Sequence, residues 1–476
     1  MTGKFEYDLI SIGGGIAGLV AANRASQLGL KVAVLERGSG DLYACNSRYS
    51  GGVMHISYKD PANPPEELSR AINEITNGYA ASDQVQAITT NCRRGLDWLQ
   101  EQGARFMRID PSMQRADIGS RAWILTPVRP PVTQLEWKGR GADVTLRALE
   151  AGLVKRGGVM HKGTSALTLI MEQGVCRGVT ARQGDHEVQF HARAVVLADG
   201  GFQGNQELAR QHLTPAPAAV KQRGAGTGIG DGMRMAREAG ADITALDGFY
   251  GHILSRDAMQ NDRLWPYPQL DLVAAAGLLV NQDGRRFADE GLGGVFMANV
   301  IARQPDPLGT SVVWDEVIWQ DSGRAAAVAP NPALEREGGK LYKADSIKAL
   351  AGMLGVDAQG LETTVRDYNA AVAAGTIGSL QPSRSNKRRT AQAIAVAPFY
   401  GAHACAGITY TMGGVRIDGS ARVLDTGRAP IKGLYAAGAT TGGLEGGPAV
   451  GYVGGLMKGI VFGLLAAEAA VAALAS

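Results

Sequence analysis

The sequence predicts an α/β protein built on a Rossmann-type domain with a second domain or a large insertion, and three observations carry that prediction. A buried-strand pattern at residues 9–12 is followed at once by glycines spaced Gly-x-Gly-x-x-Gly, an Ala-rich helical stretch and a second apolar run at 31–36. Further strand-to-glycine turns stand at 194–205 and 433–443. The chain has 476 residues, too many for one ordinary hydrophobic core. We therefore expect a dinucleotide-binding βαβ unit and a second domain.

The residues of this βαβ unit have separate tasks. Gly13 permits the tight turn after the first strand, Gly15 lets a pyrophosphate reach the backbone, and Gly18 lets helix and strand pack closely. The helix begins at Ile16 and Ala17, where free N–H groups and the positive end of the helix dipole favour phosphate. A complete unit of this kind predicts a dinucleotide site.

An acidic residue, Glu36, ends the second strand and is followed by Arg37. The Glu36 carboxylate is placed to accept hydrogen bonds from the ribose hydroxyls of adenosine, and its charge would repel a 2′-phosphate. We therefore assign both residues to the nucleotide site.

Composition excludes several classes of partner. The chain carries 20% charged residues and a net charge of +3 without a long basic block, so nucleic acid is not expected as a partner. The one basic stretch, at 382–390, is interpreted as a solvated loop. None of the four cysteines forms a Cys-x-x-Cys pair, so iron–sulfur, zinc and c-type haem motifs are absent and no metal site is predicted.

The ends of the chain bear on location. The N-terminus lacks a basic region followed by a long apolar stretch, so no signal peptide is expected. Residues 459–476 are apolar but contain Glu468, which predicts a packed helix rather than a membrane span. Together with the cysteine pattern, this favours a reducing, cytoplasmic compartment.

Motifs along essentially the whole chain carry a family resemblance. They are NSRYSGG (46–52), GGFQGN (200–205), GTGIGDGMRMAREAGA (226–241), GLLVNQDGRRFADE (277–290) and TYTMGGVRID (409–418), followed by GLYAAG (433–438). In this order they resemble the succinate dehydrogenase/fumarate reductase flavoprotein superfamily, and within it the tricarballylate dehydrogenase-like and 3-ketosteroid dehydrogenase-like branch.

The resemblance implies FAD as the cofactor. The family loop that lies along the pyrophosphate and flavin matches Asn46, Ser47, Gly51 and Gly52. The last helix would direct its positive end at the flavin N1/C2 region. Other positions are assigned to the cofactor by the same matching, with Asp231 expected to cap its helix: Ala198, Gly200, Asp231, Gly438, Gly454 and Gly455.

Two details of the FAD site depart from common members of the family. Ala439 stands where relatives often have a glutamate that holds the ribityl chain. The loop at 44–50 contains no histidine, the usual attachment residue, so FAD is expected to be bound without a covalent bond.

The resemblance also implies the domain organisation: a discontinuous Rossmann-type FAD-binding domain with an inserted α+β capping domain. Residues 1–246 and 411–476 are expected to form the FAD-binding domain, and residues 247–410 the capping domain, with substrate between them. The segment 165–200 alternates and turns at Gly174 and Gly184, which predicts antiparallel strands. In the cap, helices are expected at about 345–355 and 358–374.

The charged residues that fumarate reductases use are largely replaced here. Glu290 matches the relay acid and is assigned to the substrate region, but Gly293 and Gly294 stand where a relay arginine would follow. The slot of the donor arginine matches Ile318. Tyr410 replaces a substrate-region histidine, and Tyr452 replaces the C-terminal substrate arginine. A dicarboxylate would therefore be poorly held.

Tyrosines suit a neutral carbonyl. A phenol donates a hydrogen bond to a ketone oxygen as enolate character develops, or acts as a base if its pKa is lowered. We therefore predict Tyr410 and Tyr452 as catalytic groups; the alternative is two buried tyrosines with one hydrogen bond each. His252 matches a histidine that faces the substrate region in tricarballylate dehydrogenase-like sequences and is the third predicted catalytic residue, or else a structural histidine.

Three further residues are assigned to the substrate with less support. They are Tyr250, Trp265, which would line an apolar pocket or pack in the core, and Arg48, the arginine to examine if the substrate is an acid.

The sequence thus predicts an FAD-dependent dehydrogenase that introduces a C=C bond α,β to the carbonyl of a small or cyclic ketone by hydride transfer to flavin N5. Two alternatives stay open: a dehydrogenase or reductase of a carboxylic acid, or an enone reductase. A flavin-binding protein without catalysis is a third reading. Because haem and iron–sulfur motifs are absent, an external electron acceptor is expected.

Overall fold

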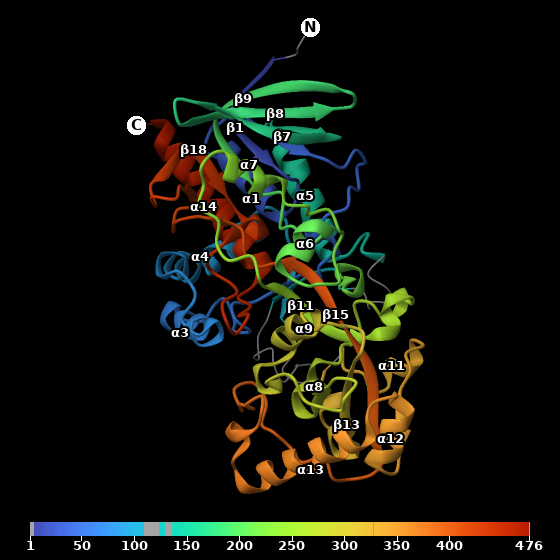
Figure 1. Ribbon diagram of the computed structural model, residues 1–476. Coiled ribbons are helices and arrows are strands. Elements are labelled where there is room, and N and C mark those ends of the chain that lie inside the picture. The colour runs from blue at the N-terminus through green and yellow to red at the C-terminus, as the bar shows by residue number, and fades with distance from the viewer. Residues whose placement is uncertain (1–3, 109–122, 129–135, 327, 476) are drawn as a thin grey trace.

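The computed structural model describes residues 4–108, 123–128, 136–326 and 328–475. Two sheets dominate it, one toward each end of the molecule (Figure 1). The larger sheet has the order β17-β18-β9-β1-β2-β6, and its strands from β18 to β6 run parallel. Their bounds are β1 Lys4–Ile12, β2 Val32–Glu36, β6 Val159–Lys162, β9 His186–Leu197, β17 Arg422–Leu424 and β18 Pro430–Ala436.

This parallel sheet joins segments from both ends of the chain. Leu9 on β1 is in register with Val32 on β2 and with Ala194 on β9, and Leu434 on β18 pairs with Val195. Strands buried on both faces need apolar residues at every position, and β2 is buried throughout. The Rossmann-type arrangement expected for the N-terminal βαβ unit is present, whereas the domain limits at 246 and 411 remain a prediction.

Three antiparallel strands extend this sheet, as the alternation at 165–200 predicts. They are β7 (Thr164–Glu172), β8 (Val175–Gln183) and β9. Gly174 and Gly184, the two turn glycines, both have positive φ.

Helices cover the parallel sheet. The central pair is α1 (Ile16–Gln27) and α14 (Gly455–Ala475), which pack on each other, with α4 (Ser82–Glu101) against α14 (Figure 1). By length and composition α14 could cross a membrane, but 61% of its most apolar window is buried in the protein. Glu468, the acidic residue of α14, pairs with Arg24 of α1 and Arg94 of α4.

The second sheet is built around one long strand, β15 (Phe399–Thr411). Its partners are β10 (Lys221–Gln222), β11 (Phe249–Ser255), β13 (Thr310–Asp315) and β14 (Tyr342–Ala344), with β12 (Leu278–Val280) on β13. β10 lies inside the range expected for the FAD-binding domain, yet it pairs with this sheet. The two helices expected in this region are α12 (Ile347–Leu354) and α13 (Ala358–Ala374).

The structure describes further helices and strands. They are α2 (Asn46–Tyr49), α3 (Pro65–Thr76), α5 (Gly141–Lys155), α6 (Gln206–His212), α7 (Asp231–Glu238), α8 (Asp271–Ala276), α9 (Gly294–Ala302), α10 (Glu316–Gln320), α11 (Ala333–Arg336), β3 (Val53–Met54), β4 (Phe106–Arg108), β5 (Trp123–Leu125), β16 (Val415–Arg416) and β19 (Thr441–Gly442).

Close approach of α1 and α14 depends on glycine. A Cβ added to Gly463 would lie 2.7 Å from the carbonyl oxygen of Ala17 and 3.1 Å from Val20 Cγ1. We expect Gly463→Ala to lower the free energy of unfolding by about 1–3 kcal/mol through overpacking. Gly352→Ala is the matched control, because a Cβ there meets nothing within 4 Å, and it should stabilise helix α12 by up to about 1 kcal/mol. Chemical denaturation measures both, and equal stability of the two variants would contradict this account of the packing.

Candidate active site

A cavity of about 540 Å³ opens beside the ends of β1 and β2 and extends to β11 and β15 of the second sheet. Fifteen of the seventeen residues that the sequence assigns to the cofactor line it: Gly13, Gly15, Ile16, Ala17, Glu36, Arg37, Asn46, Ser47, Gly51, Gly52, Ala198, Gly200, Asp231, Gly438 and Gly455. The other two, Gly18 and Gly454, do not line it but lie against the wall residues Gly13 and His55.

The glycine turn has the geometry that its sequence predicts. Gly13 has φ +104°, and a Cβ there would lie 2.5 Å from the carbonyl oxygen of Ala198. A Cβ on Gly18 would lie 1.9 Å from the Gly13 oxygen, so this glycine allows the helix to press on the turn. Gly15 caps α1 without any side-chain acceptor, and the Ile16 N–H reaches only the Ser47 hydroxyl, at 3.0 Å. The N-terminus of α1 therefore faces the cavity.

The Glu36 carboxylate is fixed at the same end of the cavity. It accepts hydrogen bonds from the backbone N–H groups of Gly14 and Gly38, both at 2.7 Å. Burial raises the pKa of Glu36, while these two hydrogen bonds act in the opposite direction. The carboxylate is held where ribose hydroxyls would meet it.

Asp199 is a cavity residue that the sequence analysis missed. It accepts a hydrogen bond of 2.7 Å from the Gly232 N–H, and burial raises its pKa to about 6. Its neighbour in space, Asp231, corrects one expectation: the N-cap of α7 is Gly230, and Asp231 is the first helical residue. Asp231 instead accepts from Arg37, at 3.1 Å.

Three tyrosines meet at the other end of the cavity. Tyr250 on β11 stacks on Tyr452 with ring centroids 3.8 Å apart, and Tyr410 on β15 lies 5.5 Å from Tyr250. Tyr58 contacts Tyr452 edge-on at 5.9 Å. The structure thus brings together Tyr250, Tyr410 and Tyr452, which are far apart in the sequence.

A histidine and a carboxylate stand behind Tyr250. His252 Nε2 lies 3.0 Å from the Tyr250 hydroxyl, and its Nδ1 contacts the Asp271 carboxylate. Asp271 also accepts a hydrogen bond of 2.8 Å from the Ile253 N–H, which fixes its orientation. A Cβ on Gly294 would lie 2.0 Å from Asp271 Cγ, so this glycine makes room for the carboxylate. The result is a buried row of Asp271, His252 and Tyr250.

A second buried carboxylate holds Tyr410. The Tyr410 hydroxyl donates to Glu445, at 3.0 and 3.1 Å from its two oxygens. Glu445 also accepts from the N–H groups of Val453 and Gly454, and from Lys458 Nζ at 3.1 Å. Burial, followed by the Glu445 charge, raises the pKa of Tyr410 well above its ordinary value. Tyr410 is therefore a neutral phenol at neutral pH.

Four positions singled out from the sequence lie outside the cavity wall. Arg48 is fully buried on the far side of α2, with its guanidinium 4.2 Å from the Tyr43 ring and 3.5 Å from Asp143. Trp265 and Ile318 are packed in the core. Glu290 is enclosed by Arg286 and Arg384. We carry none of them into the substrate site.

Sequence reasoning missed the buried residues that hydrogen-bond to the predicted tyrosines and histidine. Asp271 and Glu445 are single acidic residues in small or apolar surroundings, and Lys458 is one cation within an apolar helix. Isolated charges in apolar surroundings indicate buried pairing, and that is the signal that was available. His55 and Arg223 also line the cavity, and nothing in the sequence singled them out.

Comparison with known proteins identifies the family to which this chain belongs. Residues 8–451 match the family model described as FAD binding domain, and the chain belongs to that family, FAD_binding_2. It is a flavoprotein of the succinate dehydrogenase/fumarate reductase superfamily, an FAD-dependent oxidoreductase whose relatives act on C–C bonds.

Several curated relatives are similar along most of this chain. NADH:acrylate oxidoreductase of Vibrio harveyi is 28% identical over 82% of the chain, which spans only 37% of that protein's length. Vinyl phenol reductase of Lactiplantibacillus plantarum is 26% identical, with 93% of the chain and 91% of the relative covered. For 4-oxocyclohexanecarboxylate 2-dehydrogenase of Sinomonas cyclohexanicum the identity is 25%, with 95% and 90% covered.

Among solved structures, 3-ketosteroid delta1-dehydrogenase of Sterolibacterium denitrificans shares the fold, with a TM-score of 0.75 at 20% identity over 98% of this chain and 99% of that one. An open flavocytochrome c3 fumarate reductase has a TM-score of 0.68 at 23% identity, with 99% and 79% covered.

The residues present fit FAD. One cavity contains the N-terminus of α1, which has no side-chain cap, the side-chain-free face at Gly15 and the anchored Glu36 carboxylate. The helix N-terminus and Gly15 would hold the pyrophosphate, and Glu36 would hold the adenosine ribose. The N-terminus of α14, at Gly455, faces the same cavity beside Tyr410 and would stabilise negative charge on the flavin.

The Glu445–Lys458 pair is a testable feature of the site. We expect Glu445→Gln to lower the free energy of unfolding by about 3–5 kcal/mol, because it leaves the buried Lys458 ammonium without its counter-charge. The amide oxygen of the substituted side chain would still accept from Tyr410, so the loss reports the charge. The control is Glu445→Gln combined with Lys458→Met, which removes both charges and should recover much of the loss. Denaturant unfolding measures both, and an undiminished loss in the double variant would show that the pair is not the cause.

Proposed function

We propose that this protein is an FAD-dependent dehydrogenase that forms the C=C bond α,β to the carbonyl of a small ketone. The observation that carries the proposal is the set of neutral phenols and one histidine, backed by carboxylates, on the cavity wall. Bound FAD supplies the acceptor for the hydride. The chain must then hold the carbonyl oxygen and remove the α-proton.

Tyr452 is the proposed donor to the carbonyl oxygen. Burial, with the nearby Tyr250 and Glu445, raises the pKa of Tyr452 well above its ordinary value, so the phenol keeps its proton. The backbone N–H of Gly455 lowers the pKa of Tyr452 in part, against the effect of burial. A phenol that keeps its proton can donate it to the carbonyl oxygen of a substrate. This donation strengthens as enolate charge develops.

The row of Tyr250, His252 and Asp271 is the proposed path for the α-proton. Tyr250 lies on the cavity wall, and its hydroxyl is 3.0 Å from His252 Nε2. Asp271 on the opposite ring nitrogen fixes the orientation of the imidazole and stabilises it when protonated. Tyr250 would therefore pass its hydroxyl proton to His252 as its oxygen takes the α-proton, which leaves Tyr250 neutral and His252 protonated.

The same site could also catalyse the reverse reaction, the reduction of an enone. The same groups serve the reverse reaction, and two relatives are named as reductases, vinyl phenol reductase and NADH:acrylate oxidoreductase. The name 4-oxocyclohexanecarboxylate 2-dehydrogenase describes oxidation of a cyclic ketone. An enone reductase is therefore the second candidate, with an external electron carrier in either case and a cytoplasmic location.

Anaerobic spectroscopy of the purified holoprotein tests the function. Saturated cyclic ketones are expected to bleach the visible flavin band. Reoxidation of chemically reduced protein by enones, without bleaching by any ketone, would instead establish the reductase. If neither ketones nor enones change the flavin spectrum, carbonyl chemistry is wrong.

Loss of the carbonyl donor has a defined kinetic signature. Tyr452→Phe should lower the rate constant of flavin reduction by about 100- to 1,000-fold and leave the pH dependence up to about pH 9 unchanged, because the phenol does not ionise in that range. Tyr342→Phe, a buried tyrosine of β14, is the control and should change neither. Stopped-flow absorbance measures both variants, and a wild-type rate in Tyr452→Phe would remove Tyr452 from the mechanism.

We also propose that FAD is held without a covalent bond, since the loop at 44–50 carries no histidine, although Cys45 and His55 line the cavity. Acid precipitation should leave the flavin in solution; flavin retained in the pellet would show a covalent link.

A further inference from the structure

A second, smaller cavity of about 60 Å³ adjoins the first one. Three residues line both cavities: Tyr58, His252 and Tyr452. At roughly 10–15 Å³ for one water-sized group, it holds only a few such groups, which is the size of a carboxylate rather than of a ring. Its wall also includes Arg388, Arg389 and Asp271. Asp271 is paired with His252 and Arg389 with Asp321. The small cavity therefore places the Arg388 guanidinium beside the phenols.

Arg388 carries the charge that a ligand in the small cavity would meet. Its guanidinium lies 5.1 Å from the centroid of the Tyr58 ring, and among the residues that the structure describes no carboxylate forms an ion pair with it. The neighbouring Arg389 differs, because it donates to Asp321 at 2.6 Å. Arg388 is thus an exposed arginine in contact with the aromatic cluster, and its charge is not neutralised by the described part of the protein.

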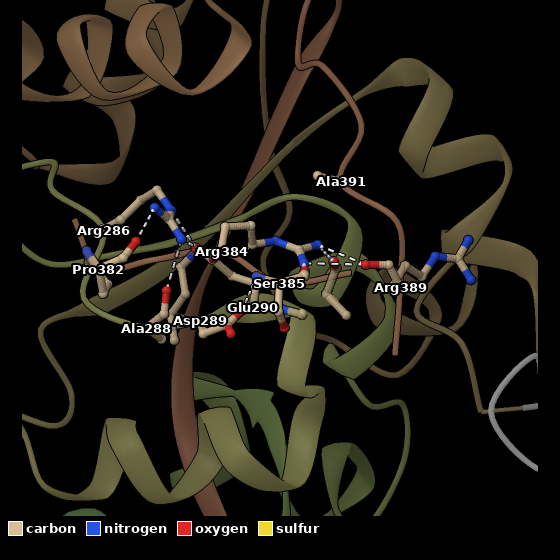
Figure 2. A network of polar contacts seen from close by, with 12 residues as sticks. Arg286, Ala288, Asp289, Glu290, Pro382, Arg384, Ser385, Arg389 and Ala391 are labelled. Carbon is tan, nitrogen blue, oxygen red and sulfur yellow. Dashed lines mark hydrogen bonds and ion pairs between the residues drawn. The ribbon is translucent and has the colours of Figure 1, made fainter. Parts of the chain in front are cut away.

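The loop that carries Arg388 is exposed at Ser383, at 386–388 and at Thr390, as expected of a solvated loop, but it is anchored at Arg384 and Ser385. Arg384 is 1% exposed and donates to the carbonyl oxygen of Ala275 at 2.7 Å. The Ser385 N–H donates to Asp289 at 2.8 Å, so the loop is bonded to the segment that contains Glu290 (Figure 2). Because this backbone is anchored, the entropy lost on binding is mainly that of the exposed Arg388 side chain.

Two glycines let this loop reach the cavity. The Arg388 N–H donates to the carbonyl oxygen of Gly291 at 2.8 Å, and a Cβ on Gly291 would lie 1.8 Å from the Ser385 oxygen. Gly293, with φ +86°, lies against the stem of Arg388, since a Cβ there would be 3.4 Å from Arg388 Cγ. Gly293 stands in the region where fumarate reductases have a relay arginine. A cation is thus brought to the cavity by another segment of the chain.

We propose that Arg388 binds a carboxylate group of the substrate, so that the substrate is a small oxo acid. Its carboxylate lies in the small cavity, and its carbonyl lies on Tyr452. Arginine suits this task because its planar fork matches a carboxylate. The assignment of the carbonyl rests on the proposed function, whereas that of the carboxylate rests on Arg388 alone.

Calorimetric binding to the oxidised holoprotein tests the carboxylate site without turnover. The probes are cyclohexanecarboxylate and its neutral counterpart, cyclohexanecarboxamide. Arg388→Met should weaken binding of the carboxylate by about tenfold or more and leave the amide unchanged. Lys387→Met is the matched control, because it makes the same change in net charge on the same loop, and both probes should bind it as they bind the wild type.

The outcomes separate this inference from the proposed function. Three results would overturn the role of Arg388, even if ketones bleach the flavin. In the first, the Arg388→Met variant binds both probes as the wild type does. In the second, the wild type does not bind the carboxylate, and in the third, Arg388→Met and Lys387→Met lose the same affinity for it. A selective loss in Arg388→Met establishes the carboxylate site, even if no ketone bleaches the flavin and the dehydrogenase proposal fails.

Discussion

The site depends on one buried carboxylate, that of Glu445. It accepts from Tyr410 at the end of β15, from the N–H groups of Val453 and Gly454, and from Lys458 on α14. These partners come from the second sheet, from the loop that carries Tyr452, and from the helix that begins at the cavity. A single anion thus fixes the relative positions of two phenols and one helix N-terminus. Its charge is compensated by a lysine that is itself buried, so neither residue is free to vary alone.

Around that carboxylate, neutral phenols line the cavity and charged groups lie behind them. Two of the phenols are each held by a charge further from the cavity, Tyr410 by Glu445 and Tyr250, through His252, by Asp271. The third, Tyr452, stacks on Tyr250. Charges placed behind the contact surface orient the phenols without repelling an uncharged substrate. The cation that the proposed substrate requires comes from a separate loop.

The sequence was sufficient for the elements whose signals are local. The βαβ unit, the three antiparallel strands at 165–200 and the helices α12 and α13 follow from periodicity and turn residues over short windows. Tyr250, His252, Tyr410 and Tyr452 were found through motifs, and the structure places them on one wall. Local signals could not show which way a side chain points. Ser47 faces the cavity, whereas Arg48, the next residue of the short helix α2, is buried on the other side of that helix. Asp271, Glu445 and Arg388 were also missed. Each of them contacts residues that are far away in the sequence, and only the tertiary structure shows these contacts.

The glycines at 293 and 294 constrain what this site can accept by mutation. The space beside them is occupied, by Asp271 against Gly294 and by the stem of Arg388 against Gly293. An arginine at either position would meet one of these side chains. Placing an arginine there therefore requires a second, compensating change at Asp271 or Arg388, so a single mutation does not supply it.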